Sequence, residues 1–169
     1  MSTESMYVLM LKEDYENDDF PITGPSEYEL YEQADFGARF GNEAGVSSRK
    51  INKEKADRVN AAKEFVGLIG NDICYANGDT VKFRENAREI FAKRQLKKLR
   101  EAVDNMTPDN FLIDGEWKIR NILRDKYWHV HPYGENCQGS YTQAPEDFIV
   151  NNMENGESYI VSEIINVCY

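Results

Sequence analysis

The strongest constraint on the fold is a long helical repeat of apolar residues in the middle of the chain. Between about residue 84 and residue 106, apolar side chains recur at alternating steps of four and three residues, and charged residues fill most of the positions between them. The members of this stripe are Ala92, Leu96, Leu99, Val103 and Met106. Such spacing is typical of one face of an amphipathic helix that packs on a core. The sequence therefore predicts a helix over 84–106 with this stripe buried.

Short runs with strand character lie on both sides of this helix. The apolar run Tyr7–Leu11 predicts a buried strand. Two short runs, 73–75 and 80–83, flank Asn77-Gly78, a pair that is typical of β-hairpin turns. Further strands are predicted at 127–131, ended by Pro132, and at 158–169, where β-branched residues are frequent.

Three more segments have helix signals. Ser26 and Glu29 form a capping box, which predicts a helix that extends to about Phe40. Apolar residues at helical spacing predict another helix over 52–69, ended by Gly70. Thr107-Pro108 is typical of a helix start, and 114–125 favours helix over strand.

Helices and strands that alternate in this way predict an α+β fold. We expect a small mixed or mainly antiparallel sheet of about four to five strands, with three or more helices packed on it. The 169 residues fit a single domain over 1–169. Composition is ordinary for a globular protein, with 41% hydrophobic and 30% charged residues.

Cellular location is predicted from the apolar runs and the cysteines. No run approaches the roughly 20 apolar residues of a membrane-spanning helix, and the N-terminal residues lack the basic segment of a secretory signal. Cys74, Cys137 and Cys168 are odd in number and far apart, as is typical of free thiols in a reducing compartment. We therefore expect a cytoplasmic protein with no membrane partner.

Charge is distributed unevenly along the chain, which has a net charge of −10. Residues 1–45 hold eleven acidic and two basic residues, whereas residues 81–101 hold eight basic and three acidic ones. The acidic N-terminal region falls into a loop over 13–19 and a helix with acidic residues at steps of three. Its candidate partner-binding residues are Glu13, Asp14, Glu16, Asp18, Asp19, Glu29, Glu32 and Asp35.

Rows of carboxylates at this spacing resemble a phosphate backbone to a protein that normally binds one. The resulting hypothesis is a non-enzymatic interaction protein, without a cofactor, whose acidic surface binds a basic protein partner. Inhibition of a nucleic-acid-binding protein is one form of this hypothesis, as in the nucleic-acid mimics of phages and mobile elements. No phosphate-binding loop, dinucleotide-binding motif or nucleophile elbow is present in the sequence.

A first alternative is a small metal-dependent hydrolase or nuclease. His129 and His131 are two residues apart on a predicted strand, so they share a face, and Cys137 and Glu135 follow closely. Such a short pattern often arises by chance, and no residue that would orient the histidines is evident. We therefore expect no metal site.

A second alternative is a nucleic-acid binder that uses the basic helix over 84–106. Lys93, Lys97 and Arg100 lie on one side of this helix, with Arg94 and Lys98 beside them. The acidic balance of the whole chain opposes this alternative, so we expect no direct binding of nucleic acid.

Overall fold

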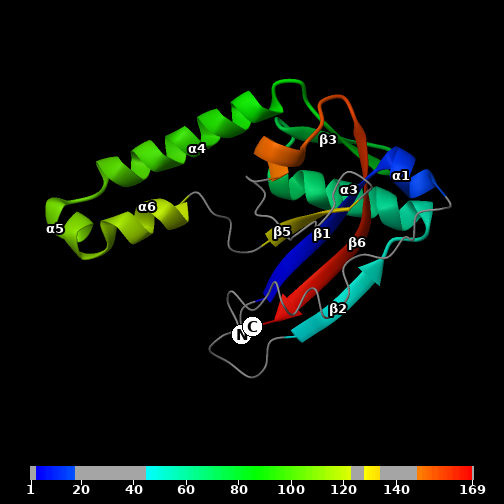
Figure 1. The fold of residues 1–169 in the computed structure, drawn as a ribbon, viewed down its shortest axis with the longest axis horizontal. Coiled ribbons are helices and arrows are strands. Elements are labelled where there is room, and N and C mark those ends of the chain that lie inside the picture. Colours follow the sequence, from blue (N-terminus) through cyan, green and yellow to red (C-terminus); the bar gives the residue numbers. More distant parts are fainter. Residues whose placement is uncertain (1–2, 18–44, 123–127, 134–147, 169) are drawn as a thin grey trace.

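The computed structural model describes residues 3–17, 45–122, 128–133 and 148–168, and within these residues the predicted α+β class is confirmed (Figure 1). The strands are β1 (Thr3–Leu11), β2 (Gly45–Ile51), β3 (Cys74–Asn77), β4 (Thr80–Phe83), β5 (Trp128–Tyr133) and β6 (Ser158–Cys168). The α-helices are α1 (Lys12–Glu16), α3 (Lys55–Ile69), α4 (Ala87–Asp104), α5 (Pro108–Asn110) and α6 (Glu116–Ile122), and two π-helical turns are η1 (Phe111–Gly115) and η2 (Phe148–Asn152).

Strand β6 lies at the centre of the six-stranded sheet. One edge of β6 pairs antiparallel with β1 over most of its length. Its other edge is divided between β2, which pairs with positions 163–168, and β4, which pairs with positions 158–159. β3 continues from β4 as a hairpin, and β5 pairs parallel with β1. The sheet is therefore mixed, with one parallel pair of strands.

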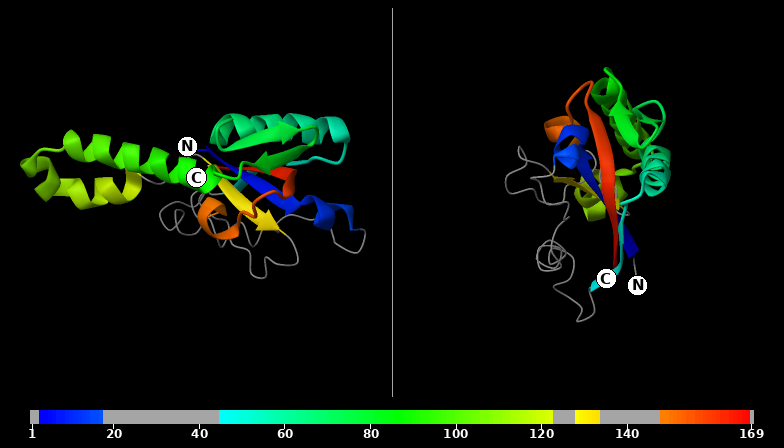
Figure 2. Two further views of the ribbon diagram at one scale, coloured as in Figure 1. Left: turned by 90° about the horizontal axis from the view of Figure 1, so that it is seen from above. Right: turned by 90° about the vertical axis from the view of Figure 1, so that its right-hand side faces the viewer.

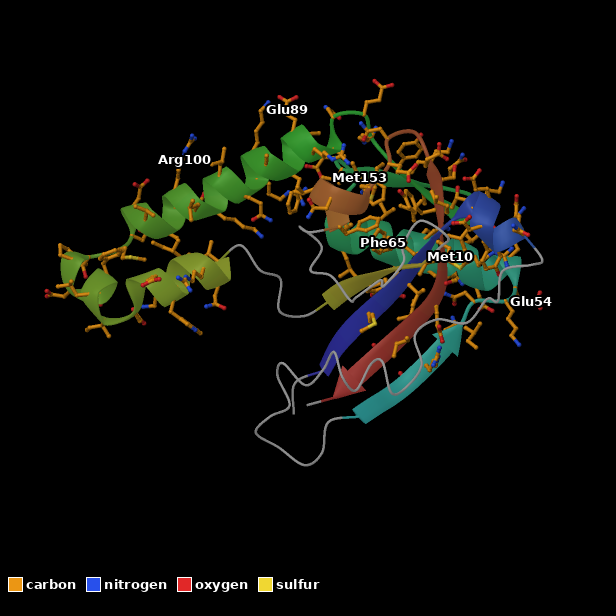
Figure 3. All side chains as sticks on the ribbon, viewed as in Figure 1. Met10, Glu54, Phe65, Glu89, Arg100 and Met153 are labelled. Carbon is orange, nitrogen blue, oxygen red and sulfur yellow. The ribbon has the colours of Figure 1, made fainter. Side chains whose placement is uncertain are left out.

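The main core lies between the sheet and α3. Phe65 of α3 is fully buried (Figure 3). Its ring makes edge-to-face contacts with Tyr7 and Phe83, at ring centroid distances of 5.6 and 6.5 Å. The Tyr7 hydroxyl donates a hydrogen bond to Glu64 Oε1 at 2.8 Å. Burial and this neighbouring carboxylate raise the pKa of Tyr7, so its hydroxyl stays a hydrogen-bond donor over the physiological range of pH.

Both faces of the central strands are buried. Tyr7 and Leu9 of β1 belong to the α3 cluster, and Met6, Val8 and Met10 between them are buried as well. This is the reason why the segment has an uninterrupted apolar run instead of an alternating one. On β6, the buried carboxylate of Glu163 accepts two hydrogen bonds from Arg49 of β2, which compensates for its removal from water.

Local signals placed several element ends correctly. The hairpin turn of β3 and β4 follows Asn77, and Gly78 adopts a positive φ of 64° that suits a two-residue turn. Gly70 ends α3 with a φ of 113°, and its amide donates to the carbonyl oxygen of Val66. Thr107 caps α5 by accepting a hydrogen bond from the Asn110 amide at 3.2 Å.

Four details differ from the sequence-based expectation. Strand β2 was not predicted, and it raises the number of strands in the described residues to six. Residues 12–16 form α1, where an acidic loop was expected over 13–19. Strand β5 continues through Pro132, because β5 lies at the edge of the strand order, where a missing amide donor is tolerated. The predicted helix over 26–40 lies outside the described residues.

The fourth difference concerns the stripe of α4, which is not part of the core. Only Ala87 and Phe91, in the first turns of α4, are buried, whereas Leu96 and Val103 are 49% and 50% exposed. Figure 1 shows the reason, since α4 extends away from the sheet after its first turns. The periodicity predicted the helix correctly, but the stripe lies on a projecting part of the molecule.

Truncation of Phe65 tests the position of the core. We expect Phe65→Ala to lower the free energy of unfolding by about 3–5 kcal/mol, because it removes a fully buried ring that contacts two others. The matched control is Leu68→Ala on the exposed side of the same helix, with an expected change of about 0.5 kcal/mol. Urea unfolding followed by circular dichroism measures both, and equal losses would contradict the placement of the core.

Candidate interaction surface

The most prominent surface feature is a projecting helical hairpin formed by α4, α5, η1 and α6, which we call the arm (residues 87–122). Helix α4 leads outward from the sheet, and α6 returns beside it (Figure 1). A second view at right angles shows the same projection (Figure 2). With about 1.5 Å per residue, the 18 residues of α4 span about 27 Å. Most of the arm therefore lies beyond the reach of the core.

Two arginines fix the base of the arm to the rest of the molecule. Arg88 donates hydrogen bonds to the carbonyl oxygens of Ile149 and Met153 in the segment that contains η2, at 3.0 and 2.5 Å. Arg94 donates to the carbonyl oxygen of Ile69 and to Asp72 Oδ1, both at 2.6 Å. Because these partners lie on two separate segments, the direction of α4 is fixed from two sides.

A glycine permits the tight packing at the far end of the arm. Gly115 is buried, and a Cβ atom there would lie 2.6 Å from Phe111 Cδ2 and 3.0 Å from Met106 Sδ. Only a hydrogen atom fits at this distance, so the Phe111 ring packs against the backbone at Gly115. The π-helical turn η1 continues directly into α6 and so joins the two sides of the hairpin.

The end of the arm exposes a cluster of large apolar side chains, which we call the tip (Phe111, Leu112, Ile113 and Trp117). Leu112 and Ile113 are 82% and 80% exposed, and Phe111 and Trp117 are more than half exposed. Single exposed apolar residues are normal on protein surfaces, but four exposed large apolar residues within the seven positions 111–117 of a projecting element are typical of an interaction site. The tip is therefore the main candidate for protein binding.

A shallow hollow of about 370 Å³ lies between α4 and α6 next to the tip. Its lining is partly apolar and partly made of amide side chains, and consists of Ala102, Asn105, Met106, Asn110, Trp117, Lys118, Asn121 and Ile122. The amide groups of Asn105 and Asn121 donate to backbone carbonyl oxygens of their own helices, which holds these side chains against the helix surface. The hollow extends the apolar tip toward the middle of the arm.

The predicted basic side of α4 is exposed, and its charges are partly compensated. Lys93 pairs with Glu89 at 2.6 Å, and Lys97 approaches Glu101 at 3.9 Å. Within the described residues, Arg100 forms no ion pair, and Figure 3 shows its side chain on the side of α4 that faces away from α6. The basic side therefore retains positive charge for a partner, although less than the sequence count suggests.

The acidic N-terminal residues are described only in part. Glu13 and Glu16 lie exposed on α1, and Asp14 lies between them and is partly buried. Tyr15 holds α1 against α3, because the guanidinium of Arg58 on α3 lies over the Tyr15 ring at 5.2 Å. The same guanidinium also pairs with Asp79. Other predicted members lie outside the described residues, namely Asp18, Asp19, Glu29, Glu32 and Asp35.

The candidate metal ligands are also described only in part. His129 and His131 lie on β5, opposite Met6 and Val8 of β1, but their side chains are outside the described part of the structure, as is Cys137. Among the side chains that are described, no group of three or more potential metal ligands gathers in one place. Cys74 is no candidate nucleophile, because burial raises the pKa of its thiol to about 12.

Sequence reasoning missed the tip, although a signal for it is present. Three large apolar residues, 111–113, follow one another directly after the helix start at Thr107-Pro108. Consecutive residues of a helix point in directions about 100° apart, so a single core cannot bury all three. Such a run at a helix start is therefore a signal for exposed apolar surface.

Comparisons with known proteins give no relative for this chain. No protein-family model, no curated protein and no solved structure matches it. None of the helices in the described segments combines the length and the apolar character needed to cross a membrane. The evidence for a function therefore comes from the surface of the molecule.

The contact at the base of the arm generates a prediction about Asp72. The hydrogen bond from Arg94 lowers the pKa of Asp72 below its ordinary value of 3.8. The ion pair therefore stabilises the fold above this ordinary value, and its contribution is lost as the pH falls through the lowered pKa. We expect NMR titration to give a midpoint for Asp72 below 3.8, and Arg94→Met to raise that midpoint toward 3.8.

Glu89 supplies an internal control in the same titration. Its pKa is lowered by a hydrogen bond from Lys93, not from Arg94, so Arg94→Met should leave the Glu89 midpoint unchanged. An Asp72 midpoint that does not respond to Arg94→Met would show that the arm is not held at this contact.

Proposed function

We propose that this protein is a non-enzymatic interaction module whose arm binds another protein through the apolar tip. The observation that carries the proposal is the exposure of Leu112 and Ile113, 82% and 80%, at the end of a hairpin that is fixed at its base. Small-molecule and catalytic sites are usually concave. A projecting apolar tip instead fits into a depression on a second protein, where its side chains act as anchors.

The rigid base of the arm supports this role. A flexible segment loses conformational entropy when it binds, whereas a helix that is already held in place loses much less. The contacts of Arg88 and Arg94 hold the first turns of α4, and Gly115 keeps the two sides of the hairpin together. The tip is therefore presented in one arrangement before binding.

Polar substitutions at the tip test this proposal. We expect the double variant Leu112→Ser, Ile113→Ser to capture its protein partner at least about tenfold less well than the unchanged chain, since buried apolar anchors dominate binding energy. Quantitative affinity capture from lysate provides the measurement. Leu68→Ser, an exposed leucine on α3, is the matched control and should leave capture unchanged. Equal capture by all three proteins would refute a role for the tip.

A second candidate function is the binding of a basic protein partner by the acidic N-terminal region. One specific observation favours it. Helix α1 carries Glu13, Asp14 and Glu16, and it is held on the body, the part of the molecule outside the arm, through Tyr15 and Arg58. Glu13 and Glu16 are exposed beside this anchor. A nucleic-acid-binding protein is the kind of basic partner that such carboxylates attract, and inhibition of that partner is one consequence.

Neutralisation of the acidic region tests this second candidate. Replacement of Glu13, Asp14, Glu16, Asp18 and Asp19 by Gln or Asn should slow association with a basic partner and leave the fold intact, because exposed charges mainly raise association rates. Stopped-flow or surface-plasmon measurements at two salt concentrations give these rates. An association rate that neither the substitutions nor added salt changes would exclude the acidic region as the recognition surface.

A further inference from the structure

The arm carries a separation of charge along its length. Residues 88–100, nearer the body, hold six basic residues and one acidic residue. Residues 101–122, the rest of the arm, hold five acidic residues and two basic ones, Lys118 and Arg120, which pair with Asp114 and Glu116. The net charges of the two halves are +5 and −3, so each half of the arm is complementary to the opposite half of a second arm that runs in the reverse direction.

Among the described residues, some of these charges have no ion-pair partner within one copy of the chain. Asp104 and Asp109 in the acidic half are exposed, and neither forms an ion pair with a described residue. The same holds for Lys98 and Arg100 in the basic half. Both halves therefore retain charge that is available for contacts between molecules.

An apolar seam accompanies this charge pattern. The stripe of α4 follows alternating steps of four and three residues, which is the spacing of a coiled-coil seam. Helix α6 contacts α4 on the side of Ala102 and Met106, where both helices line the hollow. Leu96 and Val103, at the other margin of the stripe, stay half exposed. One copy of the chain thus leaves part of its own seam uncovered.

We propose that a second copy of the chain covers this seam, with the two arms packed antiparallel around a two-fold axis. The inference rests on the proposed function, since it names the partner of the same arm. A parallel arrangement would place like charges side by side, whereas the antiparallel one places each acidic half against a basic half. An isologous interface of this kind closes on itself and produces a dimer.

The register in which the two arms pair follows from the charge pattern and the apolar seam together. The sign of the charge changes near Arg100, and Val103 is the exposed seam residue nearest to that point, so Val103 lies close to the two-fold axis. Leu96 is seven residues earlier, about 10 Å along the helix, and faces the apolar tip of the other copy. Lys97 and Arg100 of one copy then face the acidic half of the other.

A charge-exchange experiment tests the inference with the full chain. Sedimentation velocity over a range of concentrations should show the unchanged protein as a dimer that dissociates as salt increases. The variants Lys97→Glu, Arg100→Glu and Asp104→Lys, Asp109→Lys should each weaken the dimer by more than about tenfold, because each places like charges in contact. An equimolar mixture of the two variants should restore the dimer, because opposite charges meet again at both ends.

Two controls make the result specific. Lys55→Glu, Lys63→Glu reverses the same number of charges on exposed positions of α3 and should leave the dimer unchanged. Circular dichroism checks that every variant keeps its helix content. The inference is wrong if the unchanged protein stays monomeric at all concentrations. It is also wrong if the mixture of the two variants does not restore the dimer. In the monomeric case, loss of capture by the tip variant would still support the proposed function and assign the tip to a different protein.

Discussion

The pairing of β6 with three other strands is the constraint on which the rest of the structure depends. One edge of β6 binds β1, and the other edge is shared by β2 and β4. Since α4 follows β4 after three residues, the place of β4 on β6 determines where the arm leaves the body. The rings of Phe83, Phe148 and Tyr159 contact one another at this junction, with centroids 5.7–5.8 Å apart, and fix β4, η2 and β6 together.

In the arm, polar contacts lie at the base next to the rest of the molecule, and large apolar side chains are exposed at the far end. Its base is held by arginine hydrogen bonds to Ile69, Ile149 and Met153, whereas its far end exposes Leu112 and Ile113. Full burial of one such aliphatic side chain stabilises by about 1.5–3 kcal/mol. In a single copy of the chain this stabilisation is not realised at the tip. A partner that covers the tip recovers it, which is the physical reason for assigning the arm to binding.

The sequence predicted the features whose causes are local. The Thr107 cap, the turn at Gly78 and the end of α3 at Gly70 depend on a few neighbouring residues, and the structure confirms them. The burial of the α4 stripe was predicted wrongly, because periodicity shows only that side chains share a face, not which element covers that face. Strand β2 was missed since its pattern of serines and basic residues is that of an edge strand, which tertiary pairing alone stabilises. The metal-ligand and acidic-surface predictions stay predictions for the residues that lie outside the described structure.

The uneven charge of the chain also determines what kind of self-association is physically reasonable. Residues 87–122 carry a net charge of +2, so the remainder of the chain carries −12. Two such bodies repel each other, which opposes any dimer that packs body against body. Antiparallel arms avoid this repulsion because they place the two bodies at opposite ends of the paired helices. The length of α4, about 27 Å, exceeds three times the screening length of about 8 Å at physiological salt. The attraction between the halves of the arms acts over contact distances, so physiological salt suppresses the repulsion between the bodies before the arms separate, and higher salt then weakens the contact between the arms.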